Sequence, residues 1–257
     1  MLQTIAKASE VLSLYDRDHT EWGVQQVARR LGLAKSTAYD LLTSLAEVGF
    51  LTRTNKGRYE LGWRLVVLSE ILLATAEIRC EAHPVMEEIA AQYRETIHLA
   101  ILDDTKVVYV DKLEGKQAVR VELTSLGTRL YAHCSALGKV LLAYRPQEDV
   151  KRIVAIEGLP RFTPNTITDE AELQEALLNI RKQGYAYDQE EVLPDLCCVG
   201  APVRNYTGHV IAAISMSVPT YRFQRSELSF RQAIVSAAKR IEERLGYYGT
   251  LTMSSYE

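Results

Sequence analysis

Residues 24–61 read VQQVARRLGLAKSTAYDLLTSLAEVGFLTRTNKGRYEL, and their pattern decides the fold of the first part of the chain. Apolar residues recur at i, i+3, i+4 and i+7 in two short runs, which places each run on one face of a helix. The members are Val24, Val27, Ala28 and Leu31 in the first run and Ala38, Leu41, Leu42 and Leu45 in the second. Gly32 lies between the runs, where a helix end favours positive φ, and Ser36 or Thr37 is expected to cap the next helix. The stretch therefore predicts a helix, a tight turn and a second helix.

Two short alternations of polar and apolar residues follow, at residues 50–53 and 58–61, with Asn55, Lys56 and Gly57 between them. Such a pattern predicts two strands joined in a hairpin. A helix-turn-helix followed by a hairpin with a basic tip is typical of a winged helix, whose second helix enters the major groove of DNA. The alternative is a small α/β subdomain with a solvated basic edge. Hydrogen-bonding groups at the leading end of the second helix favour the DNA-binding interpretation.

The expected contacts to DNA are of two kinds. Those on the helices, where base edges would be met, are Gln25, Lys35, Ser36, Thr37, Tyr39 and Asp40. Those in the hairpin, expected at phosphates or in the minor groove, are Arg53, Lys56 and Arg58. Residues 1–62 carry eight Lys and Arg against seven Asp and Glu, and the whole chain has a net charge of −3. DNA affinity would therefore depend on the local placement of charge.

The chain as a whole has the features of a two-domain protein of a reducing compartment. Its 257 residues are enough for two domains. No apolar run is long enough to cross a membrane, and the N-terminus lacks the layout of a secretory signal. The four cysteines show no CxxC spacing, which argues against a disulfide scaffold and for the cytoplasm.

Residues flanking the helix-turn-helix predict further helices. Residues 4–15 are expected to form a supporting helix, and residues 20–23 a short connection. Residues 63–79 are apolar nearly all round, so this linker helix should be buried, against a second subunit's matching helix or within one chain. His83-Pro84 should end the pattern, with a new helix over residues 85–93 and Pro84 in its first turn.

The second half of the chain alternates between strand and helix patterns. Strands are predicted at residues 96–102, 106–110, 119–123, 185–190, 198–204 and 209–217. Helices are predicted at residues 136–143, 146–155, 169–183 and 226–245. Three strands, three helices, three strands and a helix indicate an antiparallel sheet with helices packed on it. We therefore expect a two-domain α/β protein with a winged helix-turn-helix at 1–62, a linker helix at 63–79 and an α+β domain at 80–257.

Seven blocks of the sequence, in order and with matching spacing, carry a resemblance to a known family. They are residues 35–39 with Leu41 and Leu42, 47–50, 59–62, 133–139, 184–191, 198–203 and 213–217. Over nearly its whole length the chain resembles the IclR family of transcriptional regulators. The resemblance implies a GAF-like effector domain and homodimers, or dimers of dimers, on double-stranded operator DNA. It implies no cofactor.

The resemblance also implies a pocket for a small-molecule effector. The residues carried over are Val119, Leu130, Ala136, Leu137, Asp188, Cys198, Ser215 and Ser217. Independently, Gly138 begins a helix whose free N–H groups suit an anion, and Ser215 and Ser217, two apart on a strand, face the same side. Such groups suit a small organic or sugar acid.

Each pocket residue has a simpler interpretation beside the functional one. Asp188 could cap a turn, Cys198 could be a small core residue, and Ser135 is expected to cap a helix rather than touch a ligand. Val119 and Leu130 would serve equally as plain core. In the second helix, many family members carry Arg after the Tyr, whereas this chain has Asp40, which repels phosphates but can accept from cytosine N4.

An enzyme is the alternative from another class. A catalytic triad could be formed by Ser135, His133 and Asp188, and a thiol nucleophile by Cys134. Neighbours on a strand point to opposite sides, however, which does not suit a catalytic arrangement. The sequence also has no G-x-S-x-G motif. A GAF-type sensor or thiol redox enzyme with an N-terminal interaction domain stays open. Metal binding by His98, His133 or His209 with Cys198 has no supporting spacing, so no metal is expected. The favoured function is a regulator of a catabolic operon controlled by a small acid.

Overall fold

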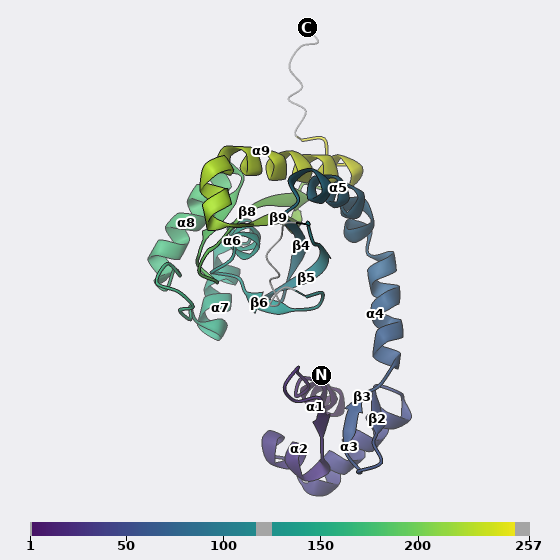
Figure 1. The fold of residues 1–257 in the computed structure, drawn as a ribbon. Coiled ribbons are helices and arrows are strands. Elements are labelled where there is room, and N and C mark those ends of the chain that lie inside the picture. The colour runs from purple at the N-terminus through teal and green to yellow at the C-terminus, as the bar shows by residue number, and fades with distance from the viewer. Residues whose placement is uncertain (1, 117–124, 250–257) are drawn as a thin grey trace. The chain divides into compact units, whose positions relative to one another are not determined.

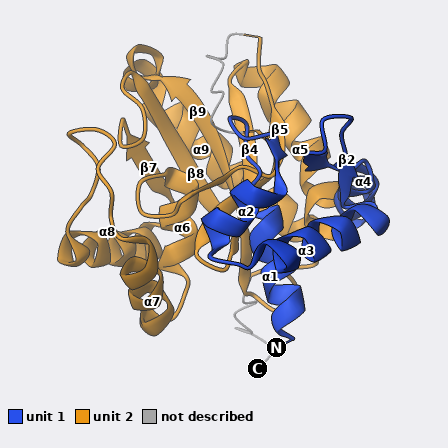
Figure 2. Ribbon diagram, turned by 90° about the horizontal axis from the view of Figure 1, so that it is seen from below, with its two compact units in different colours: residues 1–75 blue, residues 76–257 orange. Residues whose placement is uncertain are grey.

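The computed structural model describes residues 2–116 and 125–249. The strand predicted at residues 119–123, with the pocket residue Val119, lies outside this part of the chain. The chain divides into two compact units, residues 1–75 and 76–257 (Figure 2). Each unit is described by itself below.

The first unit is a winged helix followed by one more helix. Its elements are α1 (Gln3–Leu12), β1 (Glu21–Trp22), α2 (Val24–Leu31), α3 (Lys35–Glu47), β2 (Leu51–Arg53), β3 (Tyr59–Leu61) and α4 (Arg64–Thr75) (Figure 1). The strands form an antiparallel sheet in the order β1-β3-β2. The apolar stripes of α2 and α3 share one core with Val11, Leu51 and Tyr59. The predicted helix-turn-helix and hairpin are confirmed.

The turn between α2 and α3 is tighter than the sequence suggested. Gly32 ends α2 in the left-handed region at φ 64°, as expected for a glycine at this place. The predicted cap at Ser36 or Thr37 is wrong, because α3 begins at Lys35 with Ala34 as its N-cap and no side-chain cap bond. Ser36 and Thr37 instead lie in the first turn of α3.

Two further expectations for this unit need correction. The first helix ends at Leu12 rather than at residue 15, and the Tyr15 hydroxyl donates to the Tyr59 carbonyl oxygen at 3.1 Å instead. The connection at residues 20–23 contains β1, which pairs with β3 and gives the wing sheet a third strand.

The break after the linker helix falls at Ala76, not at His83-Pro84. Ala76 has φ −69° and ψ 102°, and α5 (Glu77–Tyr93) then runs through Pro84 without interruption. One buried face holds α5 in place, formed by Ala82, Val85, Met86 and Ile89. At the end of α4 the Thr75 hydroxyl donates to the Ile71 carbonyl at 2.8 Å, a bond of the kind that bends or ends helices.

The second unit is built on one six-stranded antiparallel sheet. Its further elements are β4 (Thr96–Asp103), β5 (Lys106–Leu113), β6 (Arg129–Tyr131), α6 (Ala136–Ala143), α7 (Gln147–Glu157), α8 (Glu170–Gln183), β7 (Ala186–Gln189), β8 (Leu196–Arg204), β9 (Val210–Pro219) and α9 (Thr220–Arg244). The strand order is β6-β5-β4-β9-β8-β7. The predicted antiparallel α+β domain is confirmed. Strand β6 was not predicted, and the predicted helix start at Ser226 is a non-helical residue inside α9, at φ −142°.

Alternate residues of each strand enter two different cores. On β9, Ile214, Met216 and Val218 pack in one core with α5 and α9, which lie together along one side of the sheet (Figure 1). Ala213 belongs to the other core, with apolar residues of α6, α7 and α8. Because strand side chains alternate, Ser215 and Ser217 face the side of α6. No helix within the described ranges is long and apolar enough to cross a membrane.

Candidate functional site

Four neighbouring strands bring polar side chains together on the α6 side of the sheet. Asp188 of β7 is paired with Cys198 of β8, and Cys198 with Ser217 of β9. One step along, Ser215 of β9 is paired with His98 of β4. The alternation of each strand and the register between strands therefore place these groups side by side.

Asp188, Cys198, Ser215 and Ser217 face a partly open cavity of about 440 Å³, a volume that includes open solvent at its mouth. It is lined by Tyr109, Leu130, Ser135, Ala136, Leu137, Asp188, Val192, Leu193, Leu196, Cys198, Ser215 and Ser217. Seven predicted effector contacts are thus brought together, and only Val119 lies outside the described residues. Sequence reasoning missed Tyr109, Val192, Leu193 and Leu196. Tyr109 lies in the predicted strand at residues 106–110, two residues from Val107, so strand alternation could have placed both on the buried side. The loop after β7 carries no such periodic signal.

The start of α6 forms one wall of the cavity. The Ser135 hydroxyl accepts a hydrogen bond from the Gly138 amide at 3.1 Å, which confirms the predicted cap. The Gly138 N–H was expected to be free for a ligand, and this bond shows that it is not. The first turn of a helix leaves its amides without intrahelical acceptors, and Ala136 and Leu137 occupy that turn. A Cβ on Gly138 would lie 2.2 Å from the Ala132 carbonyl oxygen, so only glycine allows this approach.

The floor of the cavity is linked by hydrogen bonds to His98, which lies outside the cavity lining. Cys198 Sγ lies 3.1 Å from Ser217 Oγ, and Ser217 Oγ lies 3.4 Å from His98 Nδ1. Burial lowers the pKa of His98 to about 3, so its imidazole is neutral at physiological pH. Burial raises the pKa of Cys198 well above its ordinary value, so the thiol is neutral too.

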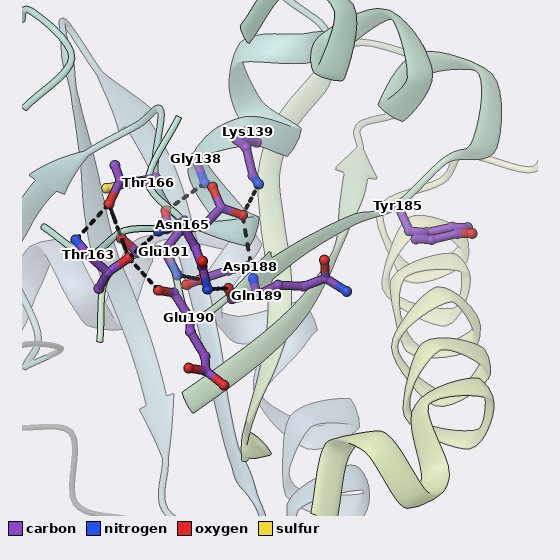
Figure 3. A network of polar contacts seen from close by, with 12 residues as sticks. Gly138, Lys139, Thr163, Asn165, Thr166, Tyr185, Asp188, Gln189, Glu190 and Glu191 are labelled. Carbon is purple, nitrogen blue, oxygen red and sulfur yellow. Dashed lines mark hydrogen bonds and ion pairs between the residues drawn. The ribbon is translucent and has the colours of Figure 1, made fainter. Parts of the chain in front are cut away.

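Asp188 is held at the edge of this floor by the segment that follows β7. Its Oδ1 accepts a hydrogen bond from the Glu191 amide at 2.8 Å, so the turn-capping role is real and accompanies the cavity position. Thr163 and Thr166, in the loop before α8, donate to the carbonyl oxygens of Glu190 and Glu191, each at 2.6 Å. Figure 3 shows this network around Asp188.

A buried ion pair lies beside Asp188. Lys139 of α6 binds the Glu191 carboxylate (Figure 3), and both side chains are buried. Burial, reinforced by the Glu191 carboxylate, raises the pKa of Asp188 to about 7. Asp188 therefore differs from an ordinary aspartate, which is fully ionised at neutral pH.

The groups considered for catalysis or metal binding have other roles in the structure. His133 Nε2 lies 3.1 Å from the Pro160 carbonyl oxygen, and Ser135 caps α6, so neither forms a triad bond with Asp188. Burial raises the pKa of the Cys134 thiol to about 12, the opposite of an activated nucleophile. In residues 2–116 and 125–249 no three His, Cys, Asp or Glu side chains gather as metal ligands.

The predicted DNA contacts lie mainly on exposed positions of the first unit. Exposed side chains are Gln25, Lys35, Ser36, Tyr39, Asp40, Arg53 and Lys56. Thr37 is partly exposed and, with Asp40, lines a shallow groove that α3 shares with Thr4 and Ala8 of α1. Tyr39, 45% exposed, presents its phenol to solvent from the first half of α3.

Arg58 differs from the other basic residues of the wing. Its guanidinium lies 3.1 Å from a carboxylate oxygen of Glu21 and donates to the Glu21 carbonyl and to Gln26 Oε1 at 3.0 and 3.1 Å. Gln26 Oε1 also accepts from the Gly23 amide at 3.0 Å. Arg58 thus ties β3 to β1 and α2 within the unit.

Comparison with known proteins agrees with this arrangement. The model of the IclR helix-turn-helix domain matches residues 4–55, and the model of the bacterial transcriptional regulator IclR C-terminal domain matches residues 71–243. The HTH-type transcriptional regulator XynR of Escherichia coli is 34% identical, over 96% of this chain and 98% of the relative. KdgR of the same organism is 33% identical, over 90% of this chain and 88% of the relative.

A solved structure extends the likeness to three dimensions. The IclR homolog of Microbacterium hydrocarbonoxydans, complexed with 4-hydroxybenzoate, superimposes with a TM-score of 0.80 at 30% identity, covering 94% of this chain and 98% of that one. These matches confirm the predicted regulator and contradict the thiol-enzyme alternative. The chain belongs to the IclR family of bacterial transcriptional regulators and acts by binding DNA, not as an enzyme.

Proposed function

We propose that this regulator controls a catabolic operon in the bacterial cytoplasm in response to a small hydroxy, oxo or sugar acid bound in the cavity of the second unit. The observation that carries the proposal is the convergence of Asp188, Cys198, Ser215 and Ser217 with the first turn of α6 on one cavity. Hydroxyls, a thiol and amides are mainly hydrogen-bond donors, which suit a carboxylate and its neighbouring oxygen. The bound acid of the Microbacterium homolog supports the same class.

For DNA, we propose that α3 meets the major groove through Lys35, Ser36, Thr37, Tyr39 and Asp40, with Gln25 nearby. Arg53 and Lys56 would reach phosphates from the wing. Arg58 holds the wing in place through Glu21 and Gln26 and is not assigned a DNA contact. The proposed segments are a DNA-binding domain at 1–62, a linker at 63–79 that holds α4 and the start of α5, and an effector domain at 80–257.

The regulator is further proposed to act as a homodimer, or as a dimer of dimers, joined through α4. This helix has no buried residue and exposes Val66, Val67, Leu68, Ile71 and Leu72. An apolar surface of this extent indicates a protein contact, and a dimer would present two winged helices to the two halves of an operator.

The effector assignment is tested on the DNA upstream of the protein's own gene. Gel shifts and calorimetry with a panel of hydroxy, oxo and sugar acids identify an acid that alters operator binding. Ser217→Ala should then weaken the binding of that acid by roughly 1–3 kcal/mol, because a polar ligand atom loses its hydrogen-bond partner. Ser229→Ala, at an exposed position of α9, is the control and should bind like the wild type. Equal affinity in all three proteins would place the effector elsewhere.

A further inference from the structure

The cavity presents a problem of charge for the acid proposed above. Its described lining contains no Lys, Arg or His side chain, and its one acidic group, Asp188, is 4% exposed. An ionised Asp188 and a ligand carboxylate would repel each other across a buried site. The cavity therefore needs either a compensating cation or a proton.

The cation whose charge acts on Asp188, Lys139, is already held in an ion pair. Lys139 is 5% exposed and binds Glu191, which is also 5% exposed. Breaking a buried pair leaves an uncompensated charge, which costs several kcal/mol, so Lys139 is not available to a ligand. Its partner also lies close to Asp188, through the bond from the Glu191 amide to Asp188 Oδ1.

The other titratable groups around Asp188 are either neutral at physiological pH or, in the case of Glu191, already held in an ion pair with Lys139. Burial raises the pKa of Tyr109 on β5, of Cys134 before α6 and of Cys198 on β8, so these groups stay neutral. His98 on β4, with its lowered pKa, is neutral as well. For Glu191 the Lys139 ammonium opposes the burial that raises its pKa. Asp188 is the group of this cluster that is left to take up a proton.

We propose that the acid effector enters this cavity together with one proton, which Asp188 carries, so that Asp188 binds the ligand as a neutral hydrogen-bond donor. This inference rests on the proposed function, because it concerns the same site and the same class of ligand. A protonated Asp188 adds one donor to Ser215, Ser217 and the α6 amides, and it removes the repulsion. Binding then involves no new covalent bond: one proton passes from solvent to the carboxyl oxygen.

A pH-dependent effector response follows. In the free protein Asp188 is protonated below pH 7, so affinity for an ionised acid is constant there. Well above pH 7 the fraction of the protein with a protonated Asp188 falls about tenfold per pH unit, and the affinity for the acid falls with it. The same regulator would thus respond to less effector in a mildly acidic cell than in an alkaline one.

Calorimetry on the full-length protein tests the proposal. Lactate, D-gluconate and 4-hydroxybenzoate are titrated from pH 6 to 8.5, each in HEPES and in Tris, whose ionisation heats differ. The expected result is an uptake of about one proton per ligand at pH 8 and a Kd that is about fivefold weaker at pH 8 than at pH 7. Asp188→Asn, which is neutral at every pH, should bind with a Kd that does not change over this range and without proton uptake. Asp104→Asn alters an exposed carboxylate that pairs with Arg152 and should keep the wild-type uptake.

Two outcomes separate this proposal from the proposed function. Binding of an acid without proton uptake would overturn the shared proton and leave the effector class standing. If none of the three acids binds at any pH, the acid class fails. The protonation of Asp188 is then measured by ¹³C NMR of its carboxyl in the free protein, with the signal assigned by comparison with Asp188→Asn. A titration midpoint near pH 7 supports the proposed protonation, and a midpoint near pH 4 overturns it.

Discussion

At the scale of single residues, the buried carboxyl of Asp188 should make folding stability depend on pH. Burial raises its pKa to about 7, whereas in the unfolded chain it titrates near 3.9. Between these values the folded protein holds the proton and the unfolded chain releases it, so stability declines as pH rises from 4 to 7 and then levels off. The sign is opposite to that of a salt-bridged aspartate.

Asp188→Asn should remove this decline, because an amide never ionises and its oxygen can still accept from the Glu191 amide. At pH 8 the variant should be more stable than the wild type by roughly 4 kcal/mol at most, and at pH 4 the two should be nearly equal. Urea unfolding at both pH values measures the difference. A variant that is less stable at pH 8 would mean that Asp188 is held as a favourable anion.

A site residue could be predicted from the sequence only where a local pattern places it. Ser215 and Ser217 were predicted to share a side because strand side chains alternate. By contrast, the pairing of Lys139 with Glu191 joins residues that lie far apart in the sequence, and only the packing of α6 against the loop after β7 brings them together. A protonated Asp188 beside a ligand carboxylate was conceivable from the sequence, but the burial that raises its pKa arises only from tertiary packing.

At the scale of elements, the wing separates two arginines that look alike in sequence. Arg53 is exposed at the end of β2, whereas Arg58 is held by Glu21 and Gln26. Arg53→Ala should weaken binding to all DNA sequences and flatten the dependence of log K on log salt by about one, since one fewer counterion is released. Fluorescence anisotropy at several salt concentrations measures this slope.

Arg58→Ala serves as the matched comparison. It should lower the stability of the first unit by loosening β1 and α2 from β3, with little change in salt slope for the folded fraction. Thermal unfolding in parallel with the anisotropy separates the two effects. Equal changes in salt slope for both variants would show that Arg58 also contacts a phosphate.

Tyr39 should act differently from the wing, because α3 is proposed to meet base edges rather than phosphates. Tyr39→Ala is expected to change the ranking of operator variants, with a salt slope like that of the wild type. Binding measured against a set of operators with single base-pair changes tests this role. An equal loss on every operator would assign Tyr39 to the backbone instead.

Element prediction succeeded where a pattern was long enough to repeat. The apolar stripes of α2, α3 and α8 each span two turns or more, and their helices were predicted within a few residues. β1 has two residues and β6 three, and, unlike β2 and β3, neither is joined to its partner strand by a short turn, so both are held by pairing with strands farther away along the chain. The helix α5 continues through Pro84 because its buried face outweighs the lost backbone bond, a balance set by tertiary packing.

At the scale of the whole molecule, the apolar surface of α4 is expected to decide assembly. Leu72 is 67% and Leu68 43% exposed in the single chain, while the polar positions of the helix are few. Leu72→Asp would put an unpaired charge into a dimer contact, at a cost of several kcal/mol. The variant should therefore be monomeric at micromolar concentration in analytical ultracentrifugation, where the wild type is expected to be a dimer or tetramer.

Loss of the dimer should also lower operator affinity, because two linked winged helices bind two half-sites with a high effective concentration. Glu70→Lys changes the charge of the same helix at a position that is already charged, so it should keep both the assembly and the affinity. Leu68→Asp is expected to repeat the effect of Leu72→Asp. A wild type that is monomeric at micromolar concentration, or a Leu72→Asp protein that remains dimeric, would show that α4 does not join the subunits and that its apolar side chains bind another partner.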